Sequence, residues 1–177
     1  MKTIKIVITG GPGTGKSSII HELEAKGENC IHEISRQVTL EAKRDGIDQL
    51  FLEQPLLFSE KLLEGRLNQF KEASNSSANR IFLDRGLPDV VAYMDYFDTV
   101  YPEIFSATCE EHAYDKVFIL PPWKEIYKSD NERYETYEEA VRISEYLYDT
   151  YRRFGYSPIE IPKASVAERT KFILNQL

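Results

Sequence analysis

The sequence is short of the residues on which disulfide-rich, metal-stapled and membrane proteins depend. Among its 177 residues are only two cysteines, Cys30 and Cys109, which fit no metal-binding spacing and are too few for a disulfide scaffold. No apolar run approaches the roughly 20 residues of a membrane span. Residues 1–9 alternate as in a strand, and no secretion-signal cleavage site follows them. We therefore expect no membrane span and a reduced, cytoplasmic setting.

Positive charge is scarce as well. The chain has 22 Lys and Arg against 29 Asp and Glu, which gives a formal net charge of −7 at pH 7. A broad nucleic-acid-binding face needs an excess of Lys and Arg, so we expect no nucleic-acid partner, although a local basic pocket is compatible with this charge. The apolar fraction of 42% and the charged fraction of 29% exclude a disordered chain. The length fits a single domain over residues 1–177.

Short apolar runs alternate with longer amphipathic segments along the chain. Helix starts are signalled by Pro55, by the Thr136–Glu139 pair and by the Ser165–Glu168 pair. The predicted strands are 1–9, 28–33, 81–84, 117–120 and 159–161. The predicted helices are 16–26, 35–44, 88–97, one from residue 55 to the polar loop at 75–79, one from 136 to 155 and one from 165 onward.

This alternation predicts an α/β fold in which helices cover both faces of a five-stranded parallel sheet, a three-layer sandwich. Ligands of such sheets bind beyond the carboxyl ends of the strands. Gly10, Glu33, Asp84 and Pro121 all fall at predicted strand ends. We expect the functional site there.

A glycine-rich loop joins the first predicted strand to the first predicted helix. It reads Gly-Gly-Pro-Gly-Thr-Gly-Lys-Ser over residues 10–17 and matches the Walker A pattern of P-loop NTPases. Its backbone N–H groups can surround phosphate oxygens, Lys16 can contact the β and γ phosphates, and the Ser17 hydroxyl can bind magnesium. The sequence therefore predicts a site for ATP with Mg²⁺. Its nucleotide-binding residues are Gly10, Gly11, Gly13, Thr14, Gly15, Lys16, Ser17 and Ser18.

A second carboxylate narrows the class of P-loop protein. Asp84 closes an apolar strand, as a Walker B residue does, and is followed by Arg85 and Gly86. Switch-type GTPases have Asp-x-x-Gly at this point and an Asn-Lys-x-Asp motif later, and the chain has neither. Motor and remodelling ATPases place a water-activating Glu after the Asp. Arg85 cannot act as a base, but it can hold a polar or anionic substrate.

Three segments resemble a known family. They are residues 82–89 (Phe-Leu-Asp-Arg-Gly-Leu-Pro-Asp) with Ala92 and Tyr93, residues 33–36 (Glu-Ile-Ser-Arg), and Pro122-Trp123 with Asp130 and Arg133. Together with the phosphate loop, they are similar to a family of small AAA-type ATPase domains related to the ribosylnicotinamide kinase domain of NadR. More widely, the chain resembles nucleoside and nucleotide kinases.

This resemblance implies a role for each matching residue. Asp84 would hold magnesium together with Ser17, and it would act with Lys16 in catalysis. Glu33 would bind a substrate hydroxyl and accept its proton, while Arg36 and Arg85 would bind other parts of the substrate. A lid over approximately residues 122–136 would carry Arg133, with Arg142 nearby, and would neutralise charge on the transferred phosphoryl group.

Structural roles compete with these functional ones. Asp84 could cap the helix that follows it, Glu33 could cap the helix at residue 35, and Arg85 could pair with Glu33 or Asp89. Two hypotheses for the whole protein therefore stay open. The first is a kinase that transfers the γ-phosphoryl of ATP to a hydroxyl of a nucleoside-like or other metabolite. The second is a nucleotide-gated ATPase or GTPase module that binds a protein or lipid partner. The sequence does not name the acceptor, the preferred nucleotide or the oligomeric state.

Overall fold

The computed structural model describes residues 2–47, 49–127 and 135–177. Its five strands form one sheet in the order β2-β3-β1-β4-β5, and each neighbouring pair is parallel. This sheet confirms the predicted α/β fold. The strands are β1 (Ile4–Gly10), β2 (Cys30–Ile31), β3 (Arg80–Asp84), β4 (Lys116–Leu120) and β5 (Ile159–Glu160).

The helices begin close to the predicted residues. Both predicted capping boxes are present, because the Thr136 hydroxyl accepts a hydrogen bond from the Glu139 N–H at 3.2 Å, and the Ser165 hydroxyl accepts one from the Glu168 N–H at 3.3 Å. The helices are α1 (Lys16–Ala25), α2 (Ser35–Arg44), α3 (Leu50–Glu53), α4 (Pro55–Asn75), α5 (Leu87–Tyr96), α6 (Ile104–Glu111), α7 (Tyr137–Arg153) and α8 (Val166–Asn175).

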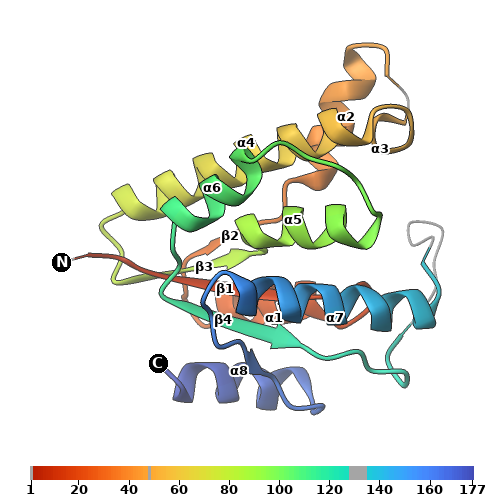
Figure 1. The fold of residues 1–177 in the computed structure, drawn as a ribbon. Helices are drawn as coiled ribbons and strands as arrows, with labels where there is room; N and C mark the ends of the chain where they lie inside the picture. Colours follow the sequence, from red (N-terminus) through yellow and green to blue (C-terminus); the bar gives the residue numbers. More distant parts are fainter. Residues whose placement is uncertain (1, 48, 128–134) are drawn as a thin grey trace.

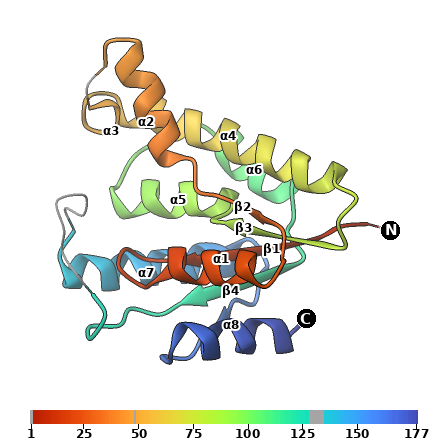
Figure 2. The ribbon, with the colours of Figure 1, turned by 180° about the vertical axis from the view of Figure 1, so that it is seen from behind.

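Alternation along the strands divides the core into two halves. In β1, Ile6 and Ile8 pack in one apolar cluster with α1 and α8, whereas Val7 packs in another cluster with α4, α5, α6 and α7. Successive side chains of a strand point to opposite faces, so β1, β3 and β4 each supply both clusters. Figures 1 and 2 show the resulting three layers, with α1 and α8 on one side of the sheet and α4, α5 and α7 on the other.

Three elements differ from the prediction. The single-turn α3 and the eight-residue α6 have no periodic pattern long enough to be recognised in the sequence. Strand β2 is shorter than predicted, because it lies at the edge of the sheet and pairs with β3 only at Cys30 and Ile31. As a result, the segment around Glu33 leaves the sheet and turns toward α2 (Figure 2). None of the helices in the described ranges is both long and apolar enough to cross a membrane.

Candidate functional site

The phosphate loop follows β1 and ends where α1 begins at Lys16. Two of its glycines have left-handed backbone conformations, with φ of 72° at Gly13 and 84° at Gly15, which residues with a side chain adopt only under strain. Inside the loop, the Thr14 hydroxyl donates a hydrogen bond to the Gly11 carbonyl at 2.9 Å. The first-turn N–H groups of α1 have no partner within the helix, so the loop can bind the oxygens of a phosphate chain.

Aromatic and cationic side chains pack against the outside of this loop. A methyl group on Gly13 would lie 2.5 Å from the Tyr127 ring, so this position is closed to other residues by contact as well as by φ. Arg169 of α8 donates a hydrogen bond to the Thr14 carbonyl at 3.0 Å and lies over the Trp123 ring at 5.6 Å. The segment after β4 therefore rests on the phosphate loop.

Lys16 and Asp84 meet at the carboxyl edge of the sheet. Ile8 of β1 is in register with Asp84, so the end of β3 lies beside the phosphate loop, and Lys16 Nζ forms an ion pair with Asp84 Oδ1. Burial lowers the pKa of Lys16, and the nearby Arg85 guanidinium lowers it further, whereas Asp84 acts in the opposite direction. A bound phosphate would give this buried ammonium a further counter-charge.

The same edge offers oxygen ligands that suit magnesium. Ser17 is exposed in the first turn of α1, and the Asp84 carboxylate ends β3. Magnesium in nucleotide sites takes one or two such protein oxygens together with waters and phosphate oxygens. The described residues contain no cluster of three or more His, Cys, Asp or Glu that could hold a metal unaided. The Ser17 hydroxyl and the Asp84 carboxylate fit the protein share of such a magnesium site.

Four charged side chains beside this pair form an alternating chain of ions, Arg66–Glu33–Arg85–Asp89. The Arg66 Nη2 group lies 3.1 and 3.3 Å from the two carboxylate oxygens of Glu33. Glu33 Oε2 lies 2.8 Å from Arg85 Nε, and Arg85 Nη1 lies 2.9 Å from Asp89 Oδ1. Charges taken out of water need such partners, because an unpaired buried ion is strongly unfavourable.

The far end of the ion chain is anchored in the core. Asp89 is fully buried and also accepts hydrogen bonds from the Thr9 hydroxyl at 2.6 Å, the Tyr151 hydroxyl at 2.6 Å and the Gly86 N–H at 3.0 Å. These bonds join β1, α5 and α7 at one carboxylate. Arg85, whose φ is 73°, is held in this uncommon backbone conformation between β3 and α5.

The other end of the ion chain is Arg66, which helix α4 supplies to Glu33. A Cβ atom at Gly65 would overlap Ile34 Cδ1, so a larger residue at this position would require the end of the Ile34 side chain to shift. The neighbouring Arg66 is buried and also donates to the Gly86 carbonyl at 3.1 Å.

Glu33 is held in its ionised form. Burial alone would raise its pKa, but Arg66, Arg85 and Lys16 outweigh burial and bring the pKa to about 2. Its Oε1 atom also accepts hydrogen bonds from the N–H groups of Ile34 at 2.9 Å and Ser35 at 3.0 Å, at the start of α2. Glu33 therefore does cap the helix and does pair with Arg85, and these contacts leave the predicted role toward a substrate as a prediction.

The structure brings most of the predicted site residues together. Lys16, Asp84, Glu33 and Arg85 share one edge of the sheet, while Arg36 is exposed on α2. Arg133 and Asp130 lie outside the described residues, so the predicted lid of 122–136 is described only in part.

Sequence reasoning missed Arg66, Asp89 as a shared acceptor, Tyr127 and Arg169. One signal for Arg66 was available: it interrupts the apolar stripe of α4 that includes Leu62, Leu63 and Ala73. A charge in such a stripe indicates a buried partner.

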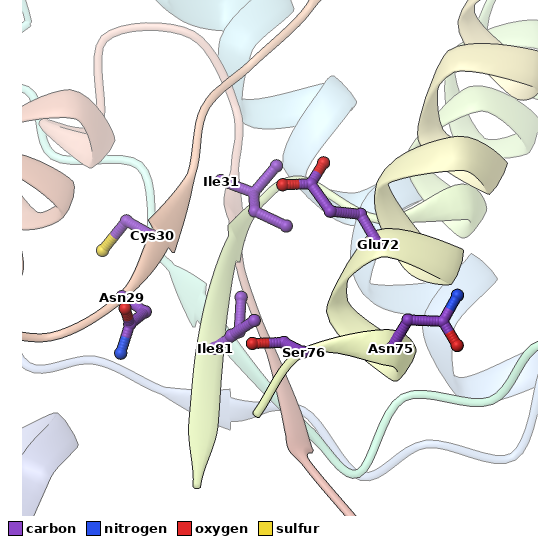
Figure 3. A pocket seen from close by; sticks show the side chains of 7 residues that line it. All are labelled: Asn29, Cys30, Ile31, Glu72, Asn75, Ser76 and Ile81. Atoms are coloured by element: carbon purple, nitrogen blue, oxygen red, sulfur yellow. The ribbon is translucent and has the colours of Figure 1, made fainter. Parts of the chain in front are cut away.

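A separate hollow of about 490 Å³ lies away from this edge (Figure 3). It is lined by Asn29, Cys30, Ile31, Glu72, Asn75, Ser76 and Ile81. Ile81 is near the start of β3 and Asn75 ends α4, so the hollow is at the end of β3 opposite Asp84. It has no contact with the phosphate loop among its lining residues.

Comparisons with known proteins agree with this geometry. The model of an AAA domain family matches residues 5–169. No curated protein matches the chain in sequence. Deoxyadenosine kinase from M. mycoides, solved with the products dCMP and a flexible dCDP, is similar with a TM-score of 0.72 at 18% identity, and 98% of each chain is covered.

Two further structures are similar. The NadR protein in complex with NR has a TM-score of 0.73 at 16% identity, covering 98% of this chain and 49% of NadR. Thymidylate kinase from Ehrlichia chaffeensis has a TM-score of 0.67 at 16% identity, covering 99% of both chains. The chain therefore shares the fold of these kinases, and it belongs to the AAA domain family whose model spans most of its length.

Proposed function

We propose that the protein is a kinase that transfers the γ-phosphoryl group of ATP to a hydroxyl group of a nucleoside-like small molecule. The observation that carries this proposal is the position of the Glu33–Arg85 ion pair, which lies beside the Lys16–Asp84 pair at the carboxyl edge of the sheet. A phosphate-binding loop next to a fixed carboxylate and guanidinium can hold a phosphoryl donor and a hydroxyl acceptor side by side. The same reaction class, phosphoryl transfer, is carried out by two proteins of similar fold, a deoxyadenosine kinase and a thymidylate kinase.

In this proposal, the residues of the phosphate loop bind ATP and Lys16 contacts its β and γ phosphates. The Ser17 hydroxyl and the Asp84 carboxylate would hold Mg²⁺. Bound magnesium would supply positive charge near the phosphate chain, which would stabilise the negative charge that develops on the leaving ADP. Lys16 would exchange its contact with Asp84 for phosphate oxygens, so the carboxylate would become available to the metal.

Glu33 and Arg85 would position the acceptor. The ionised Glu33 carboxylate accepts a hydrogen bond from the acceptor hydroxyl, and the Arg85 guanidinium donates to a neighbouring oxygen. The hydroxyl oxygen forms a bond to Pγ, the bond from Pγ to the β,γ-bridging oxygen breaks, and its electron pair leaves with ADP. The hydroxyl proton passes to Glu33 and then to solvent. Phosphoryl transfer needs little more than alignment and charge stabilisation, so a carboxylate of low pKa suffices.

The lid over residues 122–136, with Arg133, belongs to the same proposal. Its described beginning already lies on the phosphate loop, through Tyr127 at Gly13 and Trp123 at Arg169. A cover at this place would keep water away from ATP, and without an acceptor ATP would be lost only slowly. A cytoplasmic setting, where ATP is plentiful, suits this reaction.

The test is ADP release measured with and without candidate acceptors from a library of nucleosides, nucleotides and vitamins. We expect slow release from ATP alone and a rate at least tenfold higher with the right acceptor. Glu33→Gln should lower the stimulated rate while ATP affinity is retained, and Glu64→Gln, on an exposed part of α4, should leave both unchanged. The kinase proposal is refuted if no acceptor stimulates release and a partner protein instead binds only the ATP-loaded form.

A further inference from the structure

The acceptor side of the site has two layers of charge. The front layer is Glu33 and Arg85, whose side chains are 22% and 13% exposed. The rear layer is Arg66 and Asp89, whose side chains are 5% and 0% exposed. A substrate at the edge of the sheet can touch the front layer only. The rear layer affects the substrate indirectly, because Arg66 neutralises the charge of Glu33 and Asp89 neutralises the charge of Arg85.

We call these four residues, Glu33, Arg85, Arg66 and Asp89, the acceptor wall. The wall has two positive and two negative charges, so its net charge is zero. Each guanidinium has a carboxylate partner, since Arg66 contacts both oxygens of Glu33 and Arg85 lies between Glu33 and Asp89. Within the described part of the wall, no lysine or arginine remains unpaired. Arg142, whose guanidinium lies 5.8 Å from the centre of the Tyr96 ring, comes from α7 and does not belong to this ion chain.

Binding of an acceptor that carries a phosphate group would be unfavourable, because the wall offers no unpaired positive charge to a second anion. It would approach the wall beside the γ-phosphate of ATP, and within the described Arg66–Glu33–Arg85–Asp89 chain it would gain a cation only by separating one of the buried ion pairs. Separating such a pair leaves a buried carboxylate without its partner, at a cost on the order of 100-fold to 1,000-fold in affinity. The protein's net charge of −7 also disfavours the approach of an anion.

A neutral hydroxyl group meets no such cost. The Glu33 carboxylate still has acceptor capacity for an O–H group, and the Arg85 guanidinium has N–H groups to donate to a second oxygen. Neither ion pair has to separate, because a hydroxyl carries no charge of its own. Neighbouring hydroxyls, such as those of a sugar ring, match this donor and acceptor pair.

We infer that the acceptor is a hydroxyl compound without a phosphate or carboxylate group, so that a free nucleoside is phosphorylated and its 5′-monophosphate is not. The inference rests on the proposed kinase function and adds the charge of the substrate. The hydrogen bonds of Tyr151 and Thr9 to Asp89 hold the rear layer in place and keep Arg85 matched to two carboxylates.

The experiment compares each common nucleoside with its own 5′-monophosphate as acceptor for the wild-type chain. We expect kcat/KM, from ADP release, to be at least 100-fold higher for the best nucleoside than for the matching monophosphate. Equal or better use of the monophosphate would overturn the inference, and because a 5′-monophosphate accepts on a phosphate oxygen, it would also replace the proposed hydroxyl acceptor by a phosphate while phosphoryl transfer from ATP still stood. If neither class stimulates ADP release although ATP still raises the melting temperature, the kinase proposal fails, and the inference fails with it.

A charge-neutralising variant tests the cause of the selectivity. Glu33→Gln removes one negative charge from the wall. Arg66 and Arg85 then carry two positive charges against the one negative charge of Asp89, so the wall has a net charge of about +1. Affinities are measured by calorimetry with a non-hydrolysable ATP analogue and magnesium, below the melting temperature of the variant. The affinity ratio of monophosphate to nucleoside should rise at least tenfold in Glu33→Gln and stay unchanged in Glu64→Gln. An unchanged ratio in folded Glu33→Gln would refute charge balance as the cause, and if that variant does not fold, the wild-type comparison decides alone.

Discussion

Replacing Glu33 by glutamine should make the stability of the protein depend differently on pH. Glutamine resembles the protonated carboxyl group in shape, but it cannot carry the charge that Arg66 and Arg85 require. The environment of Glu33 lowers its pKa from an ordinary 4.5 to about 2. At about 1.4 kcal/mol per pKa unit, this lowering corresponds to about 3 kcal/mol of stability at neutral pH.

The sign of the effect follows from linkage. Because the pKa is lower in the folded state, the contribution of Glu33 is complete above pH 4.5 and is lost as the pH falls toward 2. Wild-type protein should therefore exceed Glu33→Gln by about 3 kcal/mol at pH 7. At pH 3 the difference should have shrunk to about 1 kcal/mol. Other acidic groups titrate in both proteins, so the difference isolates Glu33.

The assay is urea unfolding followed by circular dichroism at pH 7, 5, 4 and 3, with the slope against urea checked for constancy. Glu64→Gln is the matched control, because Glu64 is exposed on α4, and it should change stability by less than about 0.5 kcal/mol. A difference between wild type and Glu33→Gln that is the same at every pH would show that folding does not lower the pKa of Glu33, and the charge argument would be wrong.

Three further predictions concern the nucleotide side of the site. ATP with magnesium at a hundredfold excess over its dissociation constant should stabilise the wild type by about 2.7 kcal/mol, or roughly 5–10 °C in melting temperature, and Lys16→Ala should lose most of this shift. An equal shift in Lys16→Ala would mean that the nucleotide binds elsewhere. Asp84→Asn should lower turnover at least tenfold more than it weakens ATP binding, as measured by steady-state kinetics beside calorimetry, and a parallel loss of both would contradict a role toward the metal. Gly13→Ala places a methyl group against Tyr127 at a φ of 72°, so it should abolish the thermal shift, whereas Gly27→Ala, at a left-handed position with open space around it, should retain it. Normal ATP binding by Gly13→Ala would refute the close packing of Tyr127 on the loop.

Local sequence patterns were sufficient for most of the scaffold. The alternation of β1, the capping boxes of α7 and α8 and the Walker A spacing each depend on residues within a few positions of one another. The carboxyl edge of the sheet followed from the alternation of strands and helices, and this placed Lys16 beside Asp84. Strand ends are least certain in such reasoning, which is why β2 was predicted to continue to residue 33.

The sequence by itself determined the phosphate loop, the parallel sheet and the edge at which a ligand would bind, because turn chemistry and hydrophobic periodicity act locally. Only the tertiary structure decided which charges meet. Arg66 reaches Glu33 across 33 positions of the chain, and Tyr151 reaches Asp89 across 62. A charge within an apolar stripe can indicate that Arg66 is buried, but it does not show which carboxylate folding brings to that arginine. The charge of the acceptor wall is therefore a property of the packing of α4, α5 and α7 against the sheet.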